Sequence, residues 1–258
     1  MEKVMTFRHS FIAASIATIA TLGLSATTAT AEDLTAKSVV LVHGAFADGS
    51  AWNRVTPLLE EAGLDVIAAQ IPLSSLEADV ETTNRAIQRL DGPVVLVGHS
   101  WGGMVITEAG AQDKVHSLVY VAAFAPDEGQ SLGEYIADYP HADGLDHLEK
   151  DAAGYYRLTD QGVADHFAFD LPEAEIAAIA ASQGPINSAS LGTPVTQLAW
   201  QSKPNFAVVS TQDRMTHTVI QRDQIAKLDA TSVEVDTSHV PMLTYPEVVA
   251  NMIIEAAK

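Results

Sequence analysis

One serine stands where its surroundings could make it a nucleophile. Ser100 lies in the run GHSWG at residues 98–102, directly after the apolar run PVVLV at residues 93–97. A Gly-x-Ser-x-Gly run between a strand and a helix is typical of a nucleophile elbow, a turn that points the serine hydroxyl out of the carboxyl edge of a sheet. The two glycines are needed because side chains there would collide with neighbouring elements. The sequence therefore predicts Ser100 as a catalytic nucleophile.

A serine nucleophile needs a base and an acid that orients the base. His239 lies in the late run DTSHVP, and Asp213 lies earlier in the run STQDR. Each follows a predicted strand, so both would reach the same carboxyl edge as the elbow. The chain order Ser100, Asp213, His239 is the order in which elbow hydrolases carry their triad. We therefore predict His239 as the base and Asp213 as its orienting acid.

Two other residues compete for these roles. His43 ends the first predicted strand and could act as a base, but the base is expected late in the chain. We interpret His43 as a side chain that packs and hydrogen-bonds beneath the loop. Asp127 follows the fourth predicted strand, where some hydrolases of this kind place their acid. Asp213 is preferred because it matches the commoner chain order.

The run HGAF at residues 43–46 follows the first predicted strand and could face the elbow. We expect the backbone N–H groups of Ala45 and Trp101 to form an oxyanion hole there. Phe46 and Phe124 lie next to these segments and are predicted to line a substrate pocket.

Apolar runs and helical spacings alternate along the chain. Strands are predicted at residues 37–43, 65–69, 93–97, 118–122, 206–210 and 232–235. Helices are predicted at residues 52–62, 76–90, 102–111, 219–228 and 246–257. This alternation is typical of βαβ units, so the fold class predicted is α/β, with a doubly wound, mainly parallel sheet.

Residues 126–204 break the alternation. No strand of the central sheet is predicted there, only short helical pieces such as residues 172–181, so we predict a helical cap inserted into a domain spanning residues 32–258. The segment carries 13 acidic and 3 basic residues. Because a field of one sign repels ligands of that sign, neutral or cationic ligands should be favoured over anionic ones. Exposure to water alone would also explain these charges.

The first residues have the form of a secretory signal peptide. Residues 1–31 carry Lys3 and Arg8, then an uncharged apolar stretch, then the small-x-small run ATA that ends at Ala31. We predict cleavage after Ala31, a secreted or periplasmic mature protein and no stable membrane anchor; an uncleaved anchor is the alternative.

Composition excludes several classes of function. The formal net charge is −19, which argues against binding to nucleic-acid phosphates, and no cysteine is present to form disulfides or thiolate metal sites. The run HADGLDH at residues 141–147 holds metal-ligating residue types, but their spacing matches no metal template, so we predict an exposed loop and no metal site.

The runs VLVHGAF, GHSWG, STQDR and TSHVPML together resemble the α/β-hydrolase fold superfamily. No strand is predicted before the one at residues 37–43. In this short N-terminal part the chain is similar to the branch of small plant methyl esterases, hydroxynitrile lyases and bacterial pyrethroid-type esterases. The resemblance implies a cap-covered acyl pocket, no cofactor, and Ser100, Asp213 and His239 as a triad. The lyases carry Lys after the catalytic His and Thr beside the first-strand His. This sequence has Val240 and Gly44 at those two positions, so cyanohydrin cleavage is not expected.

Within this resemblance, the expected function is a serine hydrolase of small carboxylic esters that acts through an acyl-enzyme. A lactonase, an amidase or a cofactor-free haloperoxidase would use the same triad. A small-molecule binding protein on the same fold is the alternative from another class. The oligomeric state does not follow from the sequence.

Overall fold

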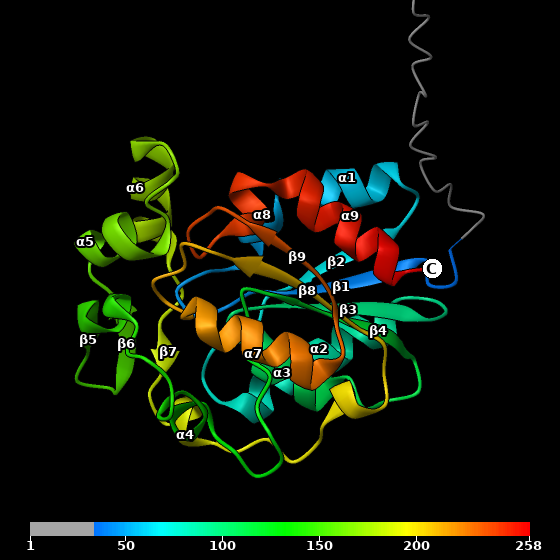
Figure 1. Ribbon diagram of the computed structural model, residues 1–258, viewed down its shortest axis with the longest axis horizontal. Helices are drawn as coiled ribbons and strands as arrows, with labels where there is room; N and C mark the ends of the chain where they lie inside the picture. The colour runs from blue at the N-terminus through cyan, green and yellow to red at the C-terminus, as the bar shows by residue number, and fades with distance from the viewer. Residues whose placement is uncertain (1–33) are drawn as a thin grey trace, which may run out of the picture.

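A parallel sheet of six strands runs through the centre of the structure, a computed structural model that describes residues 34–258 (Figure 1). The predicted signal peptide at residues 1–31 lies outside the described residues. The strands are β1 (Ser38–Val42), β2 (Asp65–Ala69), β3 (Val94–His99), β4 (Val115–Val121), β8 (Asn205–Ser210) and β9 (Thr231–Val235). Their order is β2-β1-β3-β4-β8-β9, and every pairing is parallel. The predicted doubly wound α/β fold is confirmed.

The apolar runs become strands because both faces of the sheet are covered. All residues of β1 and β3 are buried, as expected for strands between two helical layers. The chain winds outward in both directions from β1, so the carboxyl ends of β1 and β3 border the crevice where such sheets bind ligands. In the register of these two strands Val42 pairs with Gly98, which brings the end of β1 beside the predicted elbow.

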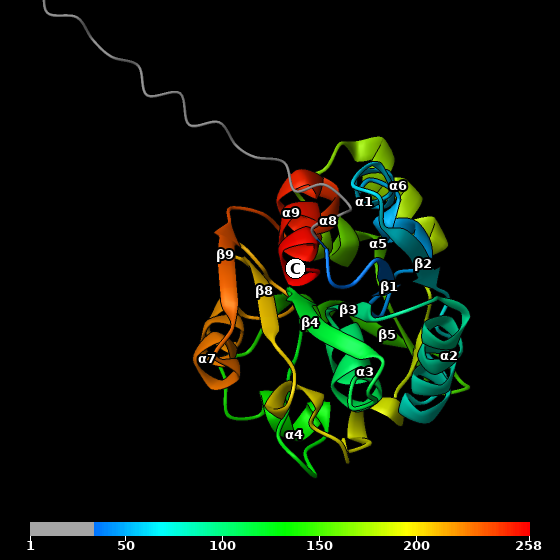
Figure 2. The same cartoon turned by 90° about the vertical axis from the view of Figure 1, so that its right-hand side faces the viewer.

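Helices cover the two faces of the sheet. One face carries α1 (Thr56–Glu61) and α9 (Pro246–Ala256), and the other carries α2 (Leu76–Arg89), α3 (Gly102–Ala109) and α7 (Thr218–Leu228) (Figures 1 and 2). A short α8 (Pro241–Thr244) precedes α9. Within residues 34–258, no helix combines the length and apolar character that a bilayer span requires.

The first predicted helix begins later in the structure than expected. Residues 49–52 form a 3₁₀-helix, η2 (Gly49–Trp52), and α1 starts only at Thr56, with Pro57 in its first turn. Proline is favoured at that position because its missing N–H has no partner there in any case. The apolar spacing over residues 52–62 thus spans two short helical pieces.

Residues 126–204 are called the cap segment; its elements at residues 132–187 lie at one end of the sheet, on the left in Figure 1, and its last residues return beneath the sheet to a short helical turn at residues 199–201 beside α3. None of its strands joins the central sheet, in agreement with the sequence. It contains a small antiparallel sheet that was not predicted, formed by β5 (Leu148–Lys150), β6 (Tyr155–Leu158) and β7 (Ile186–Asn187). Its helices are α4 (Leu132–Ile136), η3 (Asp143–His147), α5 (Asp160–Gly162), η4 (Val163–Phe167), α6 (Glu173–Ser182), η5 (Ser190–Gly192) and η6 (Ala199–Gln201).

Candidate active site

Ser100 occupies a sharp turn between β3 and α3. Its φ of 52° lies in the left-handed region, which is strained for a residue with a side chain. The turn closes only because its flanking residues are small: a Cβ at Gly98 would lie 2.5 Å from the Gly102 carbonyl oxygen, and a Cβ at Gly102 would lie 2.6 Å from that of Val42. The backbone therefore has the geometry that the nucleophile-elbow pattern requires.

The loop after β1 passes directly over Ser100. A Cβ on Gly44 would lie 2.7 Å from the Cβ of Ser100, so only glycine permits this approach. The Phe46 N–H is occupied, because it donates to the Gly184 carbonyl at 3.0 Å. The preceding residue, Ala45, lines the same cavity as Ser100. Trp101 precedes the first turn of α3, where backbone N–H groups have no intrahelical acceptor.

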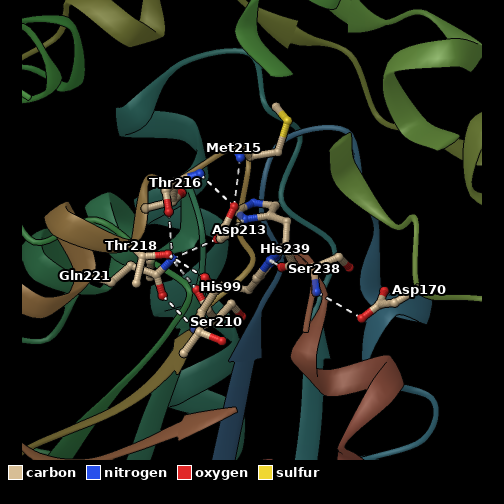
Figure 3. A network of polar contacts seen from close by, with 12 residues as sticks. His99, Asp170, Ser210, Asp213, Met215, Thr216, Thr218, Gln221, Ser238 and His239 are labelled. Carbon is tan, nitrogen blue, oxygen red and sulfur yellow. Dashed lines mark hydrogen bonds and ion pairs between the residues drawn. The ribbon is translucent and has the colours of Figure 1, made fainter. Parts of the chain in front are cut away.

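His239 and Asp213 are buried side by side (Figure 3). His239 Nδ1 lies 2.8 Å from Asp213 Oδ2. Asp213 Oδ1 also accepts hydrogen bonds from the Met215 and Thr216 N–H groups, at 2.8 and 2.9 Å. These bonds fix the position of the Asp213 carboxylate, which in turn orients the His239 ring through Nδ1. Nε2 of His239 is then free to accept a proton.

Gln221 on α7 holds the acid in place, and sequence reasoning missed it. Its Nε2 donates to Asp213 Oδ2 at 2.8 Å and to the Thr216 carbonyl at 2.7 Å, while its Oε1 accepts from the Ser210 N–H at 3.0 Å. All of its polar atoms are thus satisfied although the side chain is buried. One feature of the sequence could have indicated it: Gln221 is a polar residue on the inner face of α7, the helix that follows β8 and Asp213.

The loop that carries His239 is held from two sides. His99, fully buried behind it, places Nε2 2.8 Å from the His239 carbonyl oxygen, and burial lowers the pKa of His99 well below its usual value. The neutral ring therefore donates its Nε2 proton to that carbonyl. From the cap segment, Asp170 Oδ2 accepts from Thr237 Oγ1 at 2.6 Å and from the Ser238 N–H at 2.9 Å.

The Asp170 carboxyl has opposing influences on its pKa. Partial burial raises the pKa, but the hydrogen bonds from Ser238 and Thr237 outweigh burial and lower it below its ordinary value. Asp170 is therefore an anion that ties the cap segment to the loop of His239. Its role could not be inferred from the sequence, because the contact joins residues nearly 70 positions apart.

A second buried carboxyl group lies beneath the elbow. Asp79 on α2 is completely buried and accepts hydrogen bonds from Trp101 Nε1 at 2.8 Å and from the Leu73 N–H at 2.7 Å. Burial raises the pKa of Asp79 to about 6, although these two hydrogen bonds act in the opposite direction. The indole of Trp101 is thereby anchored to α2.

The competing residues have other contacts. His43 Nδ1 lies 2.9 Å from the Gly44 carbonyl oxygen, and its Nε2 accepts from the Ile71 N–H at 3.2 Å. Burial also lowers the pKa of His43. It packs beneath the loop, as the sequence indicated. Asp127 pairs with Lys227 at 3.4 Å, whereas the acid in contact with His239 is Asp213.

A cavity of about 400 Å³ opens between the sheet edge and the cap segment. Ser100, His239, Ala45 and Trp101 all line it, together with the predicted pocket residues Phe46 and Phe124. The remaining walls are Leu132, Gly133, Ile136, Ala137, Tyr139, Pro140, His141, Ala142, Leu145, Leu148, Ile186, Leu191, Met215, Thr216 and Ile220. These walls contain no Asp, Glu, Lys or Arg side chain, so the cavity suits an uncharged, mainly apolar ligand.

The exposed loop predicted at residues 141–147 is wrong in part: residues 143–147 form η3, and Ala142 and Gly144 are buried because the segment packs over the cavity. Its side chains carry an exposed ion pair, with His141 Nε2 2.9 Å from Asp146 Oδ1. Over residues 34–258, no group of three or more His, Cys, Asp or Glu side chains is placed to hold a metal ion.

Known proteins resemble the chain over most of its length. The family model described as "Alpha/beta hydrolase family" matches residues 39–252. The Carbendazim hydrolyzing esterase of Nocardioides sp. (strain SG-4G) is 39% identical over 110 residues, which are 36% of this chain and 44% of that esterase. Methylesterase 2 of Arabidopsis thaliana is 27% identical over 249 residues, which cover 84% of this chain and 95% of the relative.

Solved structures share the fold. A pyrethroid hydrolase from Sphingobium faniae JZ-2 superposes with a TM-score of 0.75 at 21% identity, covering 86% of this chain and 98% of the hydrolase. At this identity the likeness shows a shared arrangement of strands and helices and nothing beyond the fold.

Proposed function

The chain belongs to the alpha/beta hydrolase family and is a serine esterase of that fold; on this premise, we propose that it hydrolyses small, uncharged carboxylic esters through Ser100, His239 and Asp213. The observation that carries the proposal is the hydrogen-bonded pair of His239 and Asp213 at the same cavity as the elbow serine. This arrangement supplies a nucleophile, a base and an orienting anion together.

The reaction begins at the Ser100 hydroxyl. Nε2 of His239 removes the hydroxyl proton while Oγ attacks the ester carbonyl carbon, and the carbonyl π electrons move onto its oxygen. Asp213 stabilises the imidazolium ion that forms, and the Ala45 and Trp101 N–H groups donate to the new oxyanion.

The tetrahedral intermediate then collapses. The bond between the carbonyl carbon and the alcohol oxygen breaks, and His239 gives its Nε2 proton to that oxygen, which releases an alcohol and leaves the acyl group on Ser100. Water, deprotonated by the same histidine, attacks the acyl-enzyme and releases the carboxylic acid. The cycle needs no reactant other than ester and water.

The walls of the cavity support uncharged esters. Because they contain no Lys or Arg, a carboxylate on the substrate would lose its hydration without gaining a partner. The name of the relative Methylesterase 2 fits an ester whose alcohol part is small.

A panel of short p-nitrophenyl esters tests the proposal. Wild-type protein should release p-nitrophenolate, and Ser100→Ala should lose several orders of magnitude in turnover while keeping its circular-dichroism spectrum and melting temperature. Asn205→Ala, which changes a buried polar residue outside the cavity, serves as a control for general damage. Full turnover by folded Ser100→Ala would refute the mechanism.

We also propose that the enzyme works outside the cytoplasm. The support is the sequence of residues 1–31, with its basic start, apolar stretch and ATA run. Expression of the full chain in a bacterium, followed by N-terminal sequencing of periplasmic protein, should show Glu32 as the first residue. Uncleaved protein in the cytoplasm would contradict this proposal.

A further inference from the structure

A second cavity of about 280 Å³ lies on the far side of Phe46 from the first. It opens to solvent and is lined by η2 and the residues on either side of it, by Phe167 of η4 and by α6 in the cap segment, and by α8 with the residue that precedes it. Its apolar walls are Phe46, Ala47, Ala51, Phe167, Ala178, Ile179, Val240, Met242 and Leu243, and its polar walls are Asp48, Ser50, Asn53, Arg54, Glu175 and Ser182. Apolar side chains thus form most of a space large enough for an aromatic group.

Phe46 is the wall that the two cavities share. Its backbone is fixed in the left-handed region, with φ 62°, and its N–H is bonded to the Gly184 carbonyl. The backbone therefore stays in place, and the side chain that it carries borders both cavities. A rotation about the side-chain torsions would open one cavity into the other without moving the adjacent Ala45 N–H.

The second cavity adjoins the histidine of the site. Phe167, one of its walls, packs edge-on against the His239 ring at a centroid distance of 5.1 Å, and Val240 directly follows His239. In the proposed reaction His239 gives its proton to the alcohol oxygen, so the alcohol leaves on the side of the histidine. The second cavity lies on that side.

The rim of the second cavity carries nearly balanced charge. Arg54 Nη2 pairs with the Glu175 carboxylate at 2.7 Å, and Arg54 Nη1 donates to the Leu243 carbonyl. These contacts fasten α6 to α8 and neutralise two of the three charged walls, with Asp48 as the third. The space is therefore suited to a neutral group.

We propose that the second cavity is a subsite for the alcohol part of bulky esters, which takes neutral aromatic or branched aliphatic alcohols when the Phe46 ring swings aside. This inference rests on the proposed esterase function and extends its substrates from compact esters to esters with a large alcohol group. The chemical step is unchanged: the acyl carbon–oxygen bond breaks, and the departing oxygen takes its proton from His239.

Four tryptophan substitutions on α6 test the subsite. Ala178 and Ser182 are exposed residues that line the second cavity, so Ala178→Trp and Ser182→Trp should fill it. Ala177 and Ala181 are exposed residues of the same helix that line a different surface hollow beside Arg157. Ala177→Trp is therefore a matched control for Ala178→Trp, with the same change in size and helix propensity, and Ala181→Trp is the control for the neighbouring Ser182→Trp.

Methyl butyrate and 1-naphthylmethyl butyrate have the same acyl group and differ only in the alcohol part. Comparing them distinguishes an effect on the alcohol subsite from an effect on the chemical step. The cavity-filling variants should lower kcat/KM for the naphthylmethyl ester by roughly tenfold or more and change that for the methyl ester by less than about twofold. The controls should leave both values near wild type. Equal effects on both esters, equal effects of controls and filling variants, or no turnover of the naphthylmethyl ester by wild type would each overturn the subsite.

A substitution at the shared wall tests the path. Phe46→Ala should raise the ratio of kcat/KM for naphthylmethyl over methyl butyrate, because it joins the cavities permanently. An unchanged or lower ratio would contradict the role given to the ring. Turnover of methyl butyrate by wild type keeps this test separate from the proposed function: if the methyl ester is hydrolysed and the ratios do not move, only the subsite fails.

Discussion

Replacing Asp79 with asparagine should change how the stability of the fold depends on pH. The Asp79 carboxyl is fully buried, and its two hydrogen-bond donors do not offset the loss of hydration, so its pKa rises from 3.8 to about 6. Between these values the unfolded chain has released the proton while the folded chain still holds it. Stability must therefore fall as pH rises through this range.

The size of the effect follows from the shift. A difference of one pKa unit corresponds to about 1.4 kcal/mol, so the shift of Asp79 from 3.8 to about 6 costs the folded state about 3 kcal/mol above pH 6. Asparagine carries no charge to titrate and removes this pH-dependent cost. It also turns an NH₂ group toward Trp101 or Leu73, which adds a penalty of about 1–3 kcal/mol that does not vary with pH.

Urea denaturation at several pH values from 4 to 8 measures the difference directly. The stability of Asp79→Asn relative to wild type should improve by about 2.4 kcal/mol across this range, because a small part of the cost is already present at pH 4. Trp101→Phe removes a donor that stabilises the Asp79 carboxylate, so the fall in stability with rising pH should extend to higher pH in that variant. Parallel profiles for wild type and Asp79→Asn would refute the reasoning, because Asp79 would then titrate alike in the folded and unfolded chain.

Two sets of substitutions and one comparison of substrates test the roles of the residues around the site. Asp213→Asn should lower kcat by roughly 10³–10⁴-fold, because the His239 tautomer is lost, whereas Asp127→Asn should cost less than about tenfold; the opposite ranking in steady-state kinetics would reassign the acid. Asp170→Ala should lower kcat with little change in KM, because the loop of His239 loses its hydrogen bonds to the cap segment. Asp170→Asn should restore part of the lost kcat. A change confined to KM would instead place Asp170 in substrate binding. A neutral ester should have a higher kcat/KM than its carboxylate-bearing analogue, by more at low than at high salt, and a preference for the anion at low salt would contradict the proposed influence of the acidic cap segment.

The central sheet could be predicted from the sequence because its signals are local. Residues 93–97 are wholly apolar, most of the other runs are rich in apolar residues, and most are followed by a turn and a helical spacing, so the strands were placed to within three residues of their observed bounds. The small sheet of the cap segment could not be found in this way. Its strands have two to four residues, too few to show an alternating pattern, and they are held by pairing with one another.

The pairing of His239 with Asp213 follows from chain order and from their positions after parallel strands. The residues that support this pair do not follow from the sequence. Gln221 and Asp170 reach the site from α7 and from the cap segment, and their contacts depend on how whole elements pack. Sequence alone predicted the candidate reacting groups because elbow hydrolases usually carry them in one chain order, whereas the supporting contacts have no such order.

The central claim is that Ser100 carries the acyl group, and covalent labelling tests it most directly. A fluorophosphonate probe reacts with a serine that a neighbouring base activates. Peptide mass spectrometry after labelling should find one adduct, on the peptide with GHSWG at Ser100, and none in Ser100→Ala. An adduct on another residue, or equal labelling of Ser100→Ala, would contradict the account.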